Sequence, residues 1–344
     1  MSKFLISLQR LDDWFHHQKR ILPWRSQPTF YRVWVSEIML QQTQVVTVIP
    51  YFERFIERFP TLQDLAEACL EDVLGLWAGL GYYSRARNLH RGAKMIADQG
   101  KFPKTRAGWL EIPGVGEYTA GAILSIAGNQ PEPILDANVE RVLSRIKRVS
   151  RAKGDTEFKT RLWKISRSFV EKGYKHQMNP SQLNQALMEL GALICTPTKP
   201  RCLLCPLVDL CEASKKGDTD AFPPKKPPKE WLKVKENMHC VIFEAQWVLL
   251  RQRVKGEWRA GLWDLLEKNP GEFISNLNRV GQVETRHTVT RHKIDRKTDI
   301  WQVASKKHEI GEYRWVSVRA PEVPVGSALK KTLKAVEQVL MDRK

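Results

Sequence analysis

The chain has 344 residues, of which 42% are hydrophobic, enough for two domains that each bury a core. Its 56 Lys and Arg against 38 Asp and Glu give a formal net charge of +18, so a polyanion such as nucleic acid is the expected partner, with a merely well-solvated surface as the alternative. The absence of a long apolar run and of a signal-peptide pattern argues against a membrane span or secretion, and an intracellular location, in a bacterial-type cytoplasm or nucleoid, is expected.

Residues 1–211 are predicted to form an all-helical domain. Apolar residues recur there at three- and four-residue spacing, which is typical of helices with one buried face, and strand-like alternation is nearly absent. The predicted helices are Phe4–Phe15, Val33–Phe55, Thr61–Leu76, Tyr118–Ile126, Val139–Ile146, Phe158–Val170 and Gln182–Ile194.

A Gly-x-Gly turn formed by Gly114 and Gly116 joins two of these helices. Glycines let the backbone approach a phosphate, and the N–H groups that open the second helix would point at it with the positive end of the helix dipole. On its own, the turn is explained equally well as a plain connector between helices.

Four cysteines close the helical region in the pattern C-x6-C-x2-C-x5-C. They are Cys195, Cys202, Cys205 and Cys211. Four thiolates on short loops can hold Zn²⁺ or a [4Fe–4S] cluster, and the cluster is favoured because only one pair has the close spacing typical of zinc sites. Buried or disulfide-bonded cysteines are the alternative, although disulfides would need an oxidising compartment. Lys199 and Arg201 in the same loop are expected to contact phosphates.

Residues 212–235 are rich in Lys and Pro and are predicted to be an extended basic linker, whose lysines either follow phosphates or simply solvate a spacer. A smaller α+β domain is expected over residues 236–344. Its predicted elements are strands at 239–243, 247–250, 300–303 and 313–316 and a helix at Ala328–Met341. The remaining cysteines, Cys69 and Cys240, are expected to be small core residues.

The segment Trp34–Val45 (WVSEIMLQQTQV), the glycine hairpin and the cysteine quartet together resemble adenine DNA glycosylases of the MutY type, in the helix-hairpin-helix glycosylase superfamily. The similarity runs from Leu22-Pro23-Trp24-Arg25 to Cys211, with GLGYY at 79–83 and LDANV at 135–139 at matching intervals. It implies a helix-hairpin-helix at about residues 111–127, a [4Fe–4S] cluster loop at 195–211 and a Nudix-like lesion-inspection domain at 236–344.

Cleavage of the bond between adenine and deoxyribose calls for two carboxyl groups, because an acid should protonate the leaving base while a carboxylate stabilises the cationic sugar. By resemblance, Glu37 protonates adenine at N7, and Asp136 stabilises or captures the cation. This division needs a protonated Glu37 and an ionised Asp136, set by different environments. The alternatives are an ordinary polar helix face for Glu37, shared with Gln41 and Gln44, and a helix N-cap for Asp136.

Tyr118 occupies the position at which related glycosylase-lyases of the endonuclease III type carry a lysine that forms a Schiff base with the sugar. A phenol cannot do this, so the resemblance predicts a monofunctional glycosylase in which Tyr118 hydrogen-bonds the catalytic carboxylate or the substrate. Asn138 is expected to orient the acid or a water molecule. Packing between helices is the alternative role for Tyr118.

Other family positions imply contacts with the extruded nucleotide. Gln42 and Tyr82 match residues that intercalate into the duplex when the base is flipped out. Trp24, by apolar contact, and Glu189, by accepting a hydrogen bond from the exocyclic amine, are expected in the adenine pocket. Simple packing under the turn at Gly79 and Gly81 is the alternative for Tyr82.

The family reads 8-oxoguanine with a loop of the form His-x-Phe-Ser-His, where this chain has HTVTR at residues 287–291. Val289 cannot stack as phenylalanine does, Thr290 keeps a hydroxyl, and Arg291 places a fixed charge where a neutral ring is usual. Weakened or altered discrimination of the lesion is therefore expected, unless His292 or Lys293 compensates. The glutamate-rich metal helix of Nudix hydrolases is missing, so pyrophosphate hydrolysis is not expected.

The sequence thus predicts a monomeric, monofunctional glycosylase of base excision repair that removes adenine opposite 8-oxoguanine or guanine in double-stranded DNA. An endonuclease III-like glycosylase-lyase acting on oxidised bases and a non-catalytic iron–sulfur DNA-binding protein are the alternatives.

Overall fold

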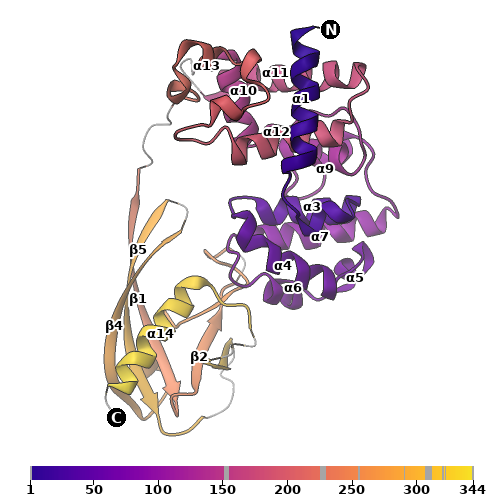
Figure 1. The fold of residues 1–344 in the computed structure, drawn as a ribbon. Helices are drawn as coiled ribbons and strands as arrows, with labels where there is room; N and C mark the ends of the chain where they lie inside the picture. Colours follow the sequence, from indigo (N-terminus) through magenta and orange to yellow (C-terminus); the bar gives the residue numbers. More distant parts are fainter. Residues whose placement is uncertain are drawn as a thin grey trace. The chain divides into compact units, whose positions relative to one another are not determined.

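The computed structural model describes residues 2–150, 155–224, 230–254, 256–289, 291–306, 312–319, 321 and 323–342 (Figure 1). The chain divides into two compact units, one of Met1–Glu67 with Asn88–Pro227 and the other of Ala68–Arg87 with Pro228–Lys344. In the described part of the chain, no helix is both long and apolar enough to cross a membrane. The expected domain boundaries at residues 211 and 236 stay predictions.

In the described residues of the first unit, the regular secondary structure is entirely helical. The helices up to residue 221 are α1 (Lys3–Gln18), α2 (Pro23–Ser26), α3 (Phe30–Leu40), α4 (Val45–Arg58), α5 (Leu62–Glu67), α6 (Leu70–Leu76), α7 (Ser84–Asp98), α8 (Arg106–Leu110), α9 (Glu117–Ile126), α10 (Ala137–Lys147), α11 (Asp155–Lys175), α12 (Pro180–Leu193) and α13 (Glu212–Lys216), with 3₁₀ turns η1 (Cys202–Leu204), η2 (Val208–Leu210) and η3 (Thr219–Ala221). Of these, α6 belongs to the second unit, and α7 begins there.

A large part of the first unit's core lies between α1, α10, α11 and α12. Leu8 and Leu11 on α1 pack there with Val142 on α10 and Leu187 on α12, all of them buried. Helices α10 and α12 approach so closely at Gly191 that a Cβ on this residue would lie 2.5 Å from the Cβ of Asn138. A side chain at this point would push α10 away, so the glycine sets the position of Asn138.

The predicted helices are confirmed, with two changes of boundary. The stretch Val33–Phe55 is two helices, α3 and α4, because the polar run Gln41–Gln44 turns between them and places Gln42 in the left-handed region at φ 58°. Thr61–Leu76 is likewise divided into α5 and α6. Helix α7 was not predicted, because the polar and charged residues Arg85 and His90 lie among the buried positions of its inner face.

Cys69 is not the core residue that its apolar surroundings suggested. It is exposed and forms the N-cap of α6, where its sulfur accepts a hydrogen bond from the backbone N–H of Asp72 at 3.4 Å. Cys240, in contrast, is buried in a strand of the second unit, as expected.

The second unit contains a mixed sheet with one helix packed on it (Figure 1). Its elements are β1 (Leu232–Phe243), β2 (Trp247–Gln252), β3 (Trp263–Asp264), the 3₁₀ turn η4 (Pro270–Glu272), β4 (Leu277–Val289), β5 (His292–Val303), β6 (Tyr313–Ser317) and α14 (Ser327–Met341). The strand order is β3-β2-β1-β5-β4, with β6 also paired to β2. Strands β1 and β5 run parallel, while β4 and β5 are antiparallel.

Helix α14 covers one face of this sheet. Leu329, Leu333 and Val336 pack with Cys240 and Ile300, and together they form the core of the second unit. The predicted α+β character of this region is therefore confirmed.

Two expectations about this region were wrong. Strand β4 was not predicted, because charged and polar residues alternate with only a few apolar ones along its length. The linker at 212–235 is not extended throughout, since α13 occupies its first residues and β1 begins at Leu232. The Lys/Pro run at 225–229 lies outside the described residues.

Candidate active site

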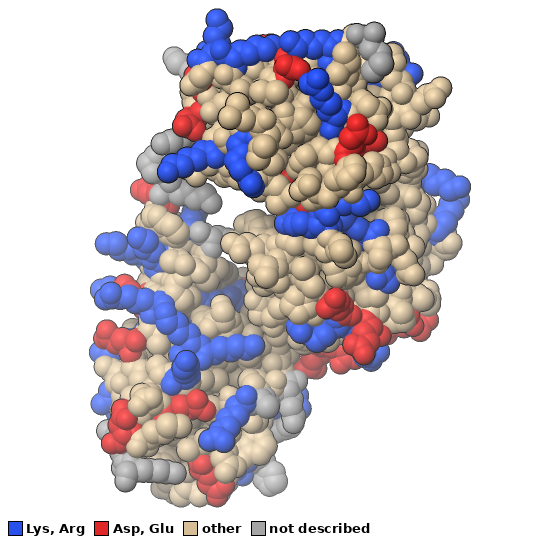
Figure 2. Space-filling model, viewed as in Figure 1, with Lys and Arg blue, Asp and Glu red and all other residues tan. Residues whose placement is uncertain are grey.

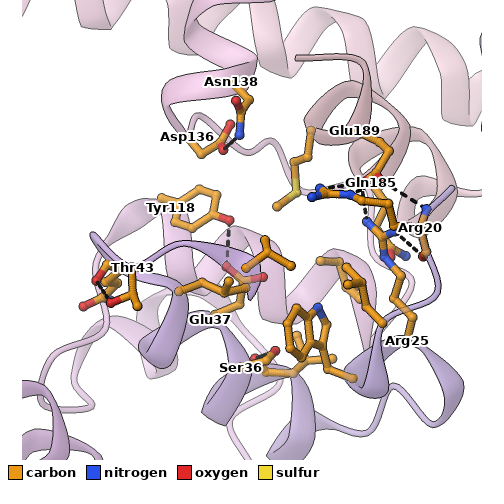
Figure 3. Close-up of a pocket in the computed structure, with 18 of the residues that line it drawn as sticks. Arg20, Arg25, Ser36, Glu37, Thr43, Tyr118, Asp136, Asn138, Gln185 and Glu189 are labelled. Atoms are coloured by element: carbon orange, nitrogen blue, oxygen red, sulfur yellow. Dashed lines mark hydrogen bonds and ion pairs between the residues drawn. The ribbon is translucent and has the colours of Figure 1, made fainter. Parts of the chain in front are cut away.

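A pocket of about 630 Å³ lies in the helical unit and brings together residues from six helices, α2, α3, α4, α9, α10 and α12 (Figure 3). The residues that sequence analysis singled out at this pocket are Trp24, Glu37, Gln42, Tyr118, Asp136, Asn138 and Glu189. They come from segments up to 165 residues apart in the chain, and the fold collects them in one cavity.

Glu37 lies on α3, a helix in which nearly every residue from Tyr31 to Met39 is buried. Its side chain is 4% exposed, and its Oε2 accepts a hydrogen bond of 2.6 Å from the Tyr118 hydroxyl. Burial raises the pKa of Glu37 to about 7, and the negative charge of Asp136 acts in the same direction, whereas the Tyr118 hydrogen bond lowers it. About half of the Glu37 carboxyls therefore carry a proton at neutral pH, as a general acid requires.

Tyr118 follows the glycine hairpin and lies in the first turn of α9. Burial raises the pKa of its hydroxyl well above 10, and the charges of Glu37 and Asp136 raise it further. The phenol consequently stays protonated and remains a hydrogen-bond donor to Glu37.

Asp136 is the N-cap of α10. The backbone N–H of Val139 donates to its Oδ1 at 2.7 Å, and the amide of Asn138 donates to its Oδ2 at 2.9 Å. Burial raises the pKa of Asp136, and these hydrogen bonds partly oppose that shift. The expected N-cap is thus confirmed, and the cap leaves the carboxylate on the pocket wall (Figure 3).

Both carboxyls are buried, so burial alone does not distinguish them. Glu37 accepts a hydrogen bond from a neutral phenol, whereas Asp136 accepts hydrogen bonds from a side-chain amide and from the N-terminus of a helix, which favours its charged form. The difference between the two environments therefore comes from hydrogen bonding.

Arg141, which sequence analysis missed, fixes the amide of Asn138. Its guanidinium donates to Asn138 Oδ1 at 2.9 Å, to the Gly191 carbonyl at 2.7 Å and to the Cys195 carbonyl at 2.6 Å. Because the amide oxygen accepts from Arg141, the amide nitrogen is turned toward Asp136. Its position three residues after Asn138 on α10 was the available signal.

Glu189 is held by two arginines that were also missed as site residues. Arg20 contacts both carboxylate oxygens, at 2.5 Å and 3.1 Å, and Arg25 donates to Oε2 at 2.9 Å (Figure 3). Burial would raise the pKa of Glu189, but the hydrogen bonds and charges of the arginines outweigh it and lower the pKa. Glu189 is therefore an ionised carboxylate with both oxygens already engaged. Trp24 packs edge-on against Phe52, with the two ring centroids 5.4 Å apart.

The two residues expected to intercalate each have a left-handed backbone that side-chain-bearing residues rarely adopt. Gln42 has a φ of 58° in the turn between α3 and α4, in the first unit. Tyr82 has a φ of 50° and lies in the second unit, where its ring is 38% exposed with the Arg85 guanidinium 5.4 Å from its centroid. Such strain is typical of functional positions.

The glycine hairpin joins α8 to α9. Gly114 has a φ of 80°, and a Cβ there would lie 2.9 Å from the Cβ of Asn88, so both conformation and space call for glycine. Gly116 is the N-cap of α9 and has no side chain with which to cap it. The first N–H groups of α9 are therefore available to an anion.

The cysteine quartet lines one small pocket together with Arg145. Arg145 is buried and donates to Cys195 Sγ at 3.3 Å and to the Thr196 carbonyl at 2.7 Å. Burial, followed by the proximity of the other sulfurs, raises the pKa of Cys205 to about 12. In the described residues, no group of three or more His, Cys, Asp and Glu side chains is gathered tightly enough to hold a single metal ion.

Of the two basic residues in this loop, Lys199 is exposed and has a left-handed φ of 49°. Arg201 is exposed as well, but its guanidinium donates to the Leu193 carbonyl at the end of α12. Arg201 thus braces the loop.

The expected lesion-reading residues lie at the end of the β4–β5 hairpin. Val289 pairs with His292, and Arg291 is exposed beside them. Thr290 lies outside the described residues. At the base of this tip, the imidazole of His287 lies 3.2 Å from the Arg259 guanidinium.

Comparisons with known proteins give the family and the fold of the helical part. Residues 35–168 match the model of the HhH-GPD superfamily of base excision DNA repair proteins. The adenine DNA glycosylase of Buchnera aphidicola is 39% identical over 254 residues, which cover 73% of this chain and 72% of that protein. The human adenine DNA glycosylase is 45% identical over 218 residues, which cover 60% of this chain and 39% of the human protein.

Solved structures show the same helical fold. A thermostable thymine-DNA glycosylase superposes with a TM-score of 0.53 at 25% identity over 62% of this chain and 97% of its own. Endonuclease III in a non-covalent DNA complex superposes with a TM-score of 0.50 at 23% identity over 63% of this chain and 99% of its own. These matches concern the fold.

Proposed function

The chain belongs to the family of adenine DNA glycosylases, and from this premise we propose that it is a monofunctional enzyme that removes adenine mispaired with 8-oxoguanine or guanine in double-stranded DNA. The observation that carries the proposal is the buried Glu37 carboxyl, which is hydrogen-bonded only to a neutral phenol in the described residues and faces the same pocket as Asp136. Burial raises the pKa of Glu37 to about 7, and the charge of Arg25 and the Tyr118 hydrogen bond offset this only in part.

In the first step, Glu37 donates its proton to N7 of the extruded adenine. Protonation makes the base a neutral leaving group, and the bond between its N9 and C1′ of the deoxyribose breaks with both electrons going to the base. Tyr118 holds the Glu37 carboxyl in place and stabilises the carboxylate that remains.

In the second step, the ionised Asp136 stabilises the positive charge on the sugar, or forms a bond to C1′ that water then displaces. Asn138 and the N-terminus of α10 orient this carboxylate and favour its charged form. Arg141 fixes the Asn138 amide in the orientation that donates to Asp136, and we assign it as a positioning residue.

Strand cleavage does not follow, because a lyase needs an amine to form a Schiff base with the sugar. Tyr118 occupies the hairpin position where an amine would be required, and its phenol stays protonated. The product is an intact strand with an abasic site.

Extrusion of adenine costs a few kcal/mol of stacking and pairing. We assign the strained residues Gln42 and Tyr82 to the space that the base leaves. The open N-terminus of α9 behind Gly114 and Gly116 would bind a backbone phosphate, as would Lys199 and Arg201. Trp24 and the Glu189 carboxylate complete the adenine pocket. Glu189 already accepts hydrogen bonds from Arg20 and Arg25, so a hydrogen bond from adenine would add a further donor to this charged network.

Cys195, Cys202, Cys205 and Cys211 fit a [4Fe–4S] cluster. They line one pocket, and burial raises the pKa of the Cys205 and Cys211 thiols. The buried Arg145 guanidinium donates to Cys195 Sγ and to backbone carbonyls, and in the described residues no carboxylate pairs with it. A cluster bound there would fold the loop at 195–211 around itself. No step of base removal involves it.

The C-terminal region at 236–344 is assigned as a Nudix-like domain that inspects the base opposite adenine. Val289, Thr290 and Arg291 stand where the family reads 8-oxoguanine, and Val289 offers no ring for stacking. We therefore expect a reduced preference for the lesion. Single-turnover cleavage of adenine opposite 8-oxoguanine and opposite guanine tests this, and a lesion preference of roughly several hundredfold would overturn it.

The proposed function is tested with duplexes that carry adenine opposite 8-oxoguanine, guanine, cytosine or thymine. Incubation followed by alkali should cleave the first two only, and omission of alkali should leave every strand intact. Strand cleavage without alkali would instead support a glycosylase-lyase. No cleavage in either condition would support a non-catalytic DNA-binding protein.

A further inference from the structure

The exposed face of the long strands β1, β5 and β4 carries an unusual charge pattern near the hairpin end. Side chains alternate along each strand, and those on one face pack under α14, as Thr285 does through its hydroxyl at 3.1 Å from that of Thr332. The intervening residues point to the other face and are exposed. Near the hairpin end they include Lys233 and Lys235 on β1, Lys293 and Asp295 on β5, and Arg286 on β4. Trp231 directly precedes β1, and Arg291 directly precedes β5.

On this face, Lys233 of β1 lies directly opposite Lys293 of β5. Like charges in such a cross-strand pair repel and weaken the sheet. Neither lysine forms an ion pair with any residue that the structure describes, whereas the next row supplies Asp295, which pairs with Arg286 at 3.2 Å. The sheet thus keeps an uncompensated pair of cations next to the hairpin tip.

Trp231 adds an aromatic group to the same corner. Its indole is 44% exposed, and the Lys293 ammonium lies 5.1 Å from its ring centroid. The Arg291 carbonyl accepts a hydrogen bond from Leu232, so the arginine, the tryptophan and the lysine pair are neighbours. Exposed aromatic rings interleaved with lysine and arginine are typical of surfaces that bind nucleic acid.

We propose that this corner, made of Trp231, Lys233, Arg291 and Lys293, is a binding surface for the sugar-phosphate backbone of DNA. Lys233 and Lys293 would each neutralise a phosphate, and Trp231 would pack on a sugar or base edge next to it. The proposal deepens the proposed function, on which it rests for its choice of DNA as the polyanion. It assigns this sheet face to backbone binding, with Arg291 at its border with the base-reading tip.

Charge complementarity favours a polyanion over an apolar or acidic partner. Lys and Arg side chains project from the region of these long strands in Figure 2, and the whole chain carries a net charge of +18. Because the repulsion between Lys233 and Lys293 is relieved when phosphates bind, the same pair that weakens the free sheet strengthens the complex.

The test uses the full chain and a matched duplex without a mispair, so that no base is removed during the measurement. Binding is measured by fluorescence anisotropy between 50 and 200 mM salt. The double variant Lys233→Gln/Lys293→Gln should lower the slope of log K against log salt by about 1.8, the loss of two phosphate contacts. The control Lys268→Gln/Lys330→Gln, which removes two exposed lysines elsewhere in the same unit, should leave the slope unchanged.

A second measurement separates lost binding from lost folding. The double variant should melt at a temperature no lower than that of the parent, since a repulsion is removed. Lys233→Glu, which places an acid opposite Lys293, should raise the melting temperature and weaken DNA binding further. Trp231→Leu should weaken binding about fivefold or more with an unchanged salt slope.

Equal slopes for the parent, the double variant and the control would overturn the proposal. An equal decrease of the slope in the double variant and in the control would overturn it as well. Adenine removal from an A:G duplex is measured in parallel at saturating protein. If the parent removes no adenine while the slopes differ as expected, the proposed function fails and the surface stands. If adenine is removed and the slopes agree, the surface fails alone.

Discussion

Glu37 in the helical unit and Asp264 in the sheet unit are both almost completely buried carboxyls, and they behave in opposite ways. Glu37 in the helical unit is 4% exposed, and Asp264 in the sheet unit is 3% exposed. Arg296 binds both oxygens of Asp264 at 2.8 and 2.9 Å, and Arg259 adds a contact at 2.8 Å. Burial alone would raise the pKa of Asp264, but the arginines together lower it.

The difference teaches that burial alone does not produce a catalytic acid. Burial raises the pKa of Glu37 to about 7, and no guanidinium binds this carboxyl in the described residues to reverse the shift, whereas the guanidiniums around Asp264 lower its pKa and fix it as a structural anion. The buried Glu37 therefore destabilises the helical unit at high pH but keeps a proton available. In the sheet unit, the buried Asp264 carboxylate instead stabilises the fold through its bonds to Arg296 and Arg259. The predictions below separate these two roles.

Glu37→Gln should give the largest effect, a loss of adenine removal of about a thousandfold or more, because the amide cannot donate the proton at N7. Folding should be unharmed, since a neutral side chain of the same shape replaces a buried acid. Single-turnover cleavage and denaturant unfolding of the same preparation check both statements. Full activity in the variant would show that the pocket is not catalytic.

Asp264→Asn should show the reverse pattern. It leaves the buried Arg296 without its bidentate partner, and the free energy of unfolding of the sheet unit should fall by about 3–5 kcal/mol. Denaturant unfolding measures the loss, and the rate of adenine removal by the fraction that remains folded should change little. A stability equal to that of the parent would contradict the role assigned to this anion.

Tyr118→Phe should have an intermediate effect, a roughly tenfold slower removal of adenine. The hydrogen bond that lowers the pKa of Glu37 is lost, so the pH at which activity falls should move upward. A rate measured across pH separates this effect from simple disorder of the pocket, which would lower the rate without moving the profile.

The family resemblance indicated Glu37 and Asp136 through short motifs, and the structure places both on one pocket. The resemblance did not indicate the arginines that lie around the pocket. Arg20 contacts Glu189 across 169 positions and Arg141 reaches Cys195 across 54, and such pairings exist only once the helices have packed. Local spacing could suggest only the contact between Arg141 and Asn138.

The fold shows the same limit. Helices with an unbroken apolar stripe were predicted, whereas α7 was missed because buried positions on it are held by Arg85 and His90. Strand β4 was missed for a related reason. Its sequence shows little apolar alternation, and backbone pairing with β5 holds it in the sheet. Cys69 shows that an apolar neighbourhood in sequence does not imply burial in the fold.

The raised pKa of Glu37 makes the free energy of unfolding depend on pH in a definite direction. Its pKa is raised on folding, so the folded protein prefers the protonated acid, and stability is lost as the pH rises from the unfolded pKa near 4.5 toward the folded value of about 7. Above that pH the loss reaches about 3 kcal/mol, and Glu37→Gln should therefore be more stable than the parent at pH 8 and nearly equal to it at pH 4.

The pH dependence of single-turnover adenine removal tests the central claim most directly, with an A:G duplex at saturating protein between pH 5 and 9. The rate should stay high below pH 7 and fall tenfold for each pH unit above the pKa of Glu37, and Tyr118→Phe should move this limb to higher pH. A rate that does not change between pH 6 and 9 would contradict the account, because the protonated fraction of Glu37 falls steeply across that range.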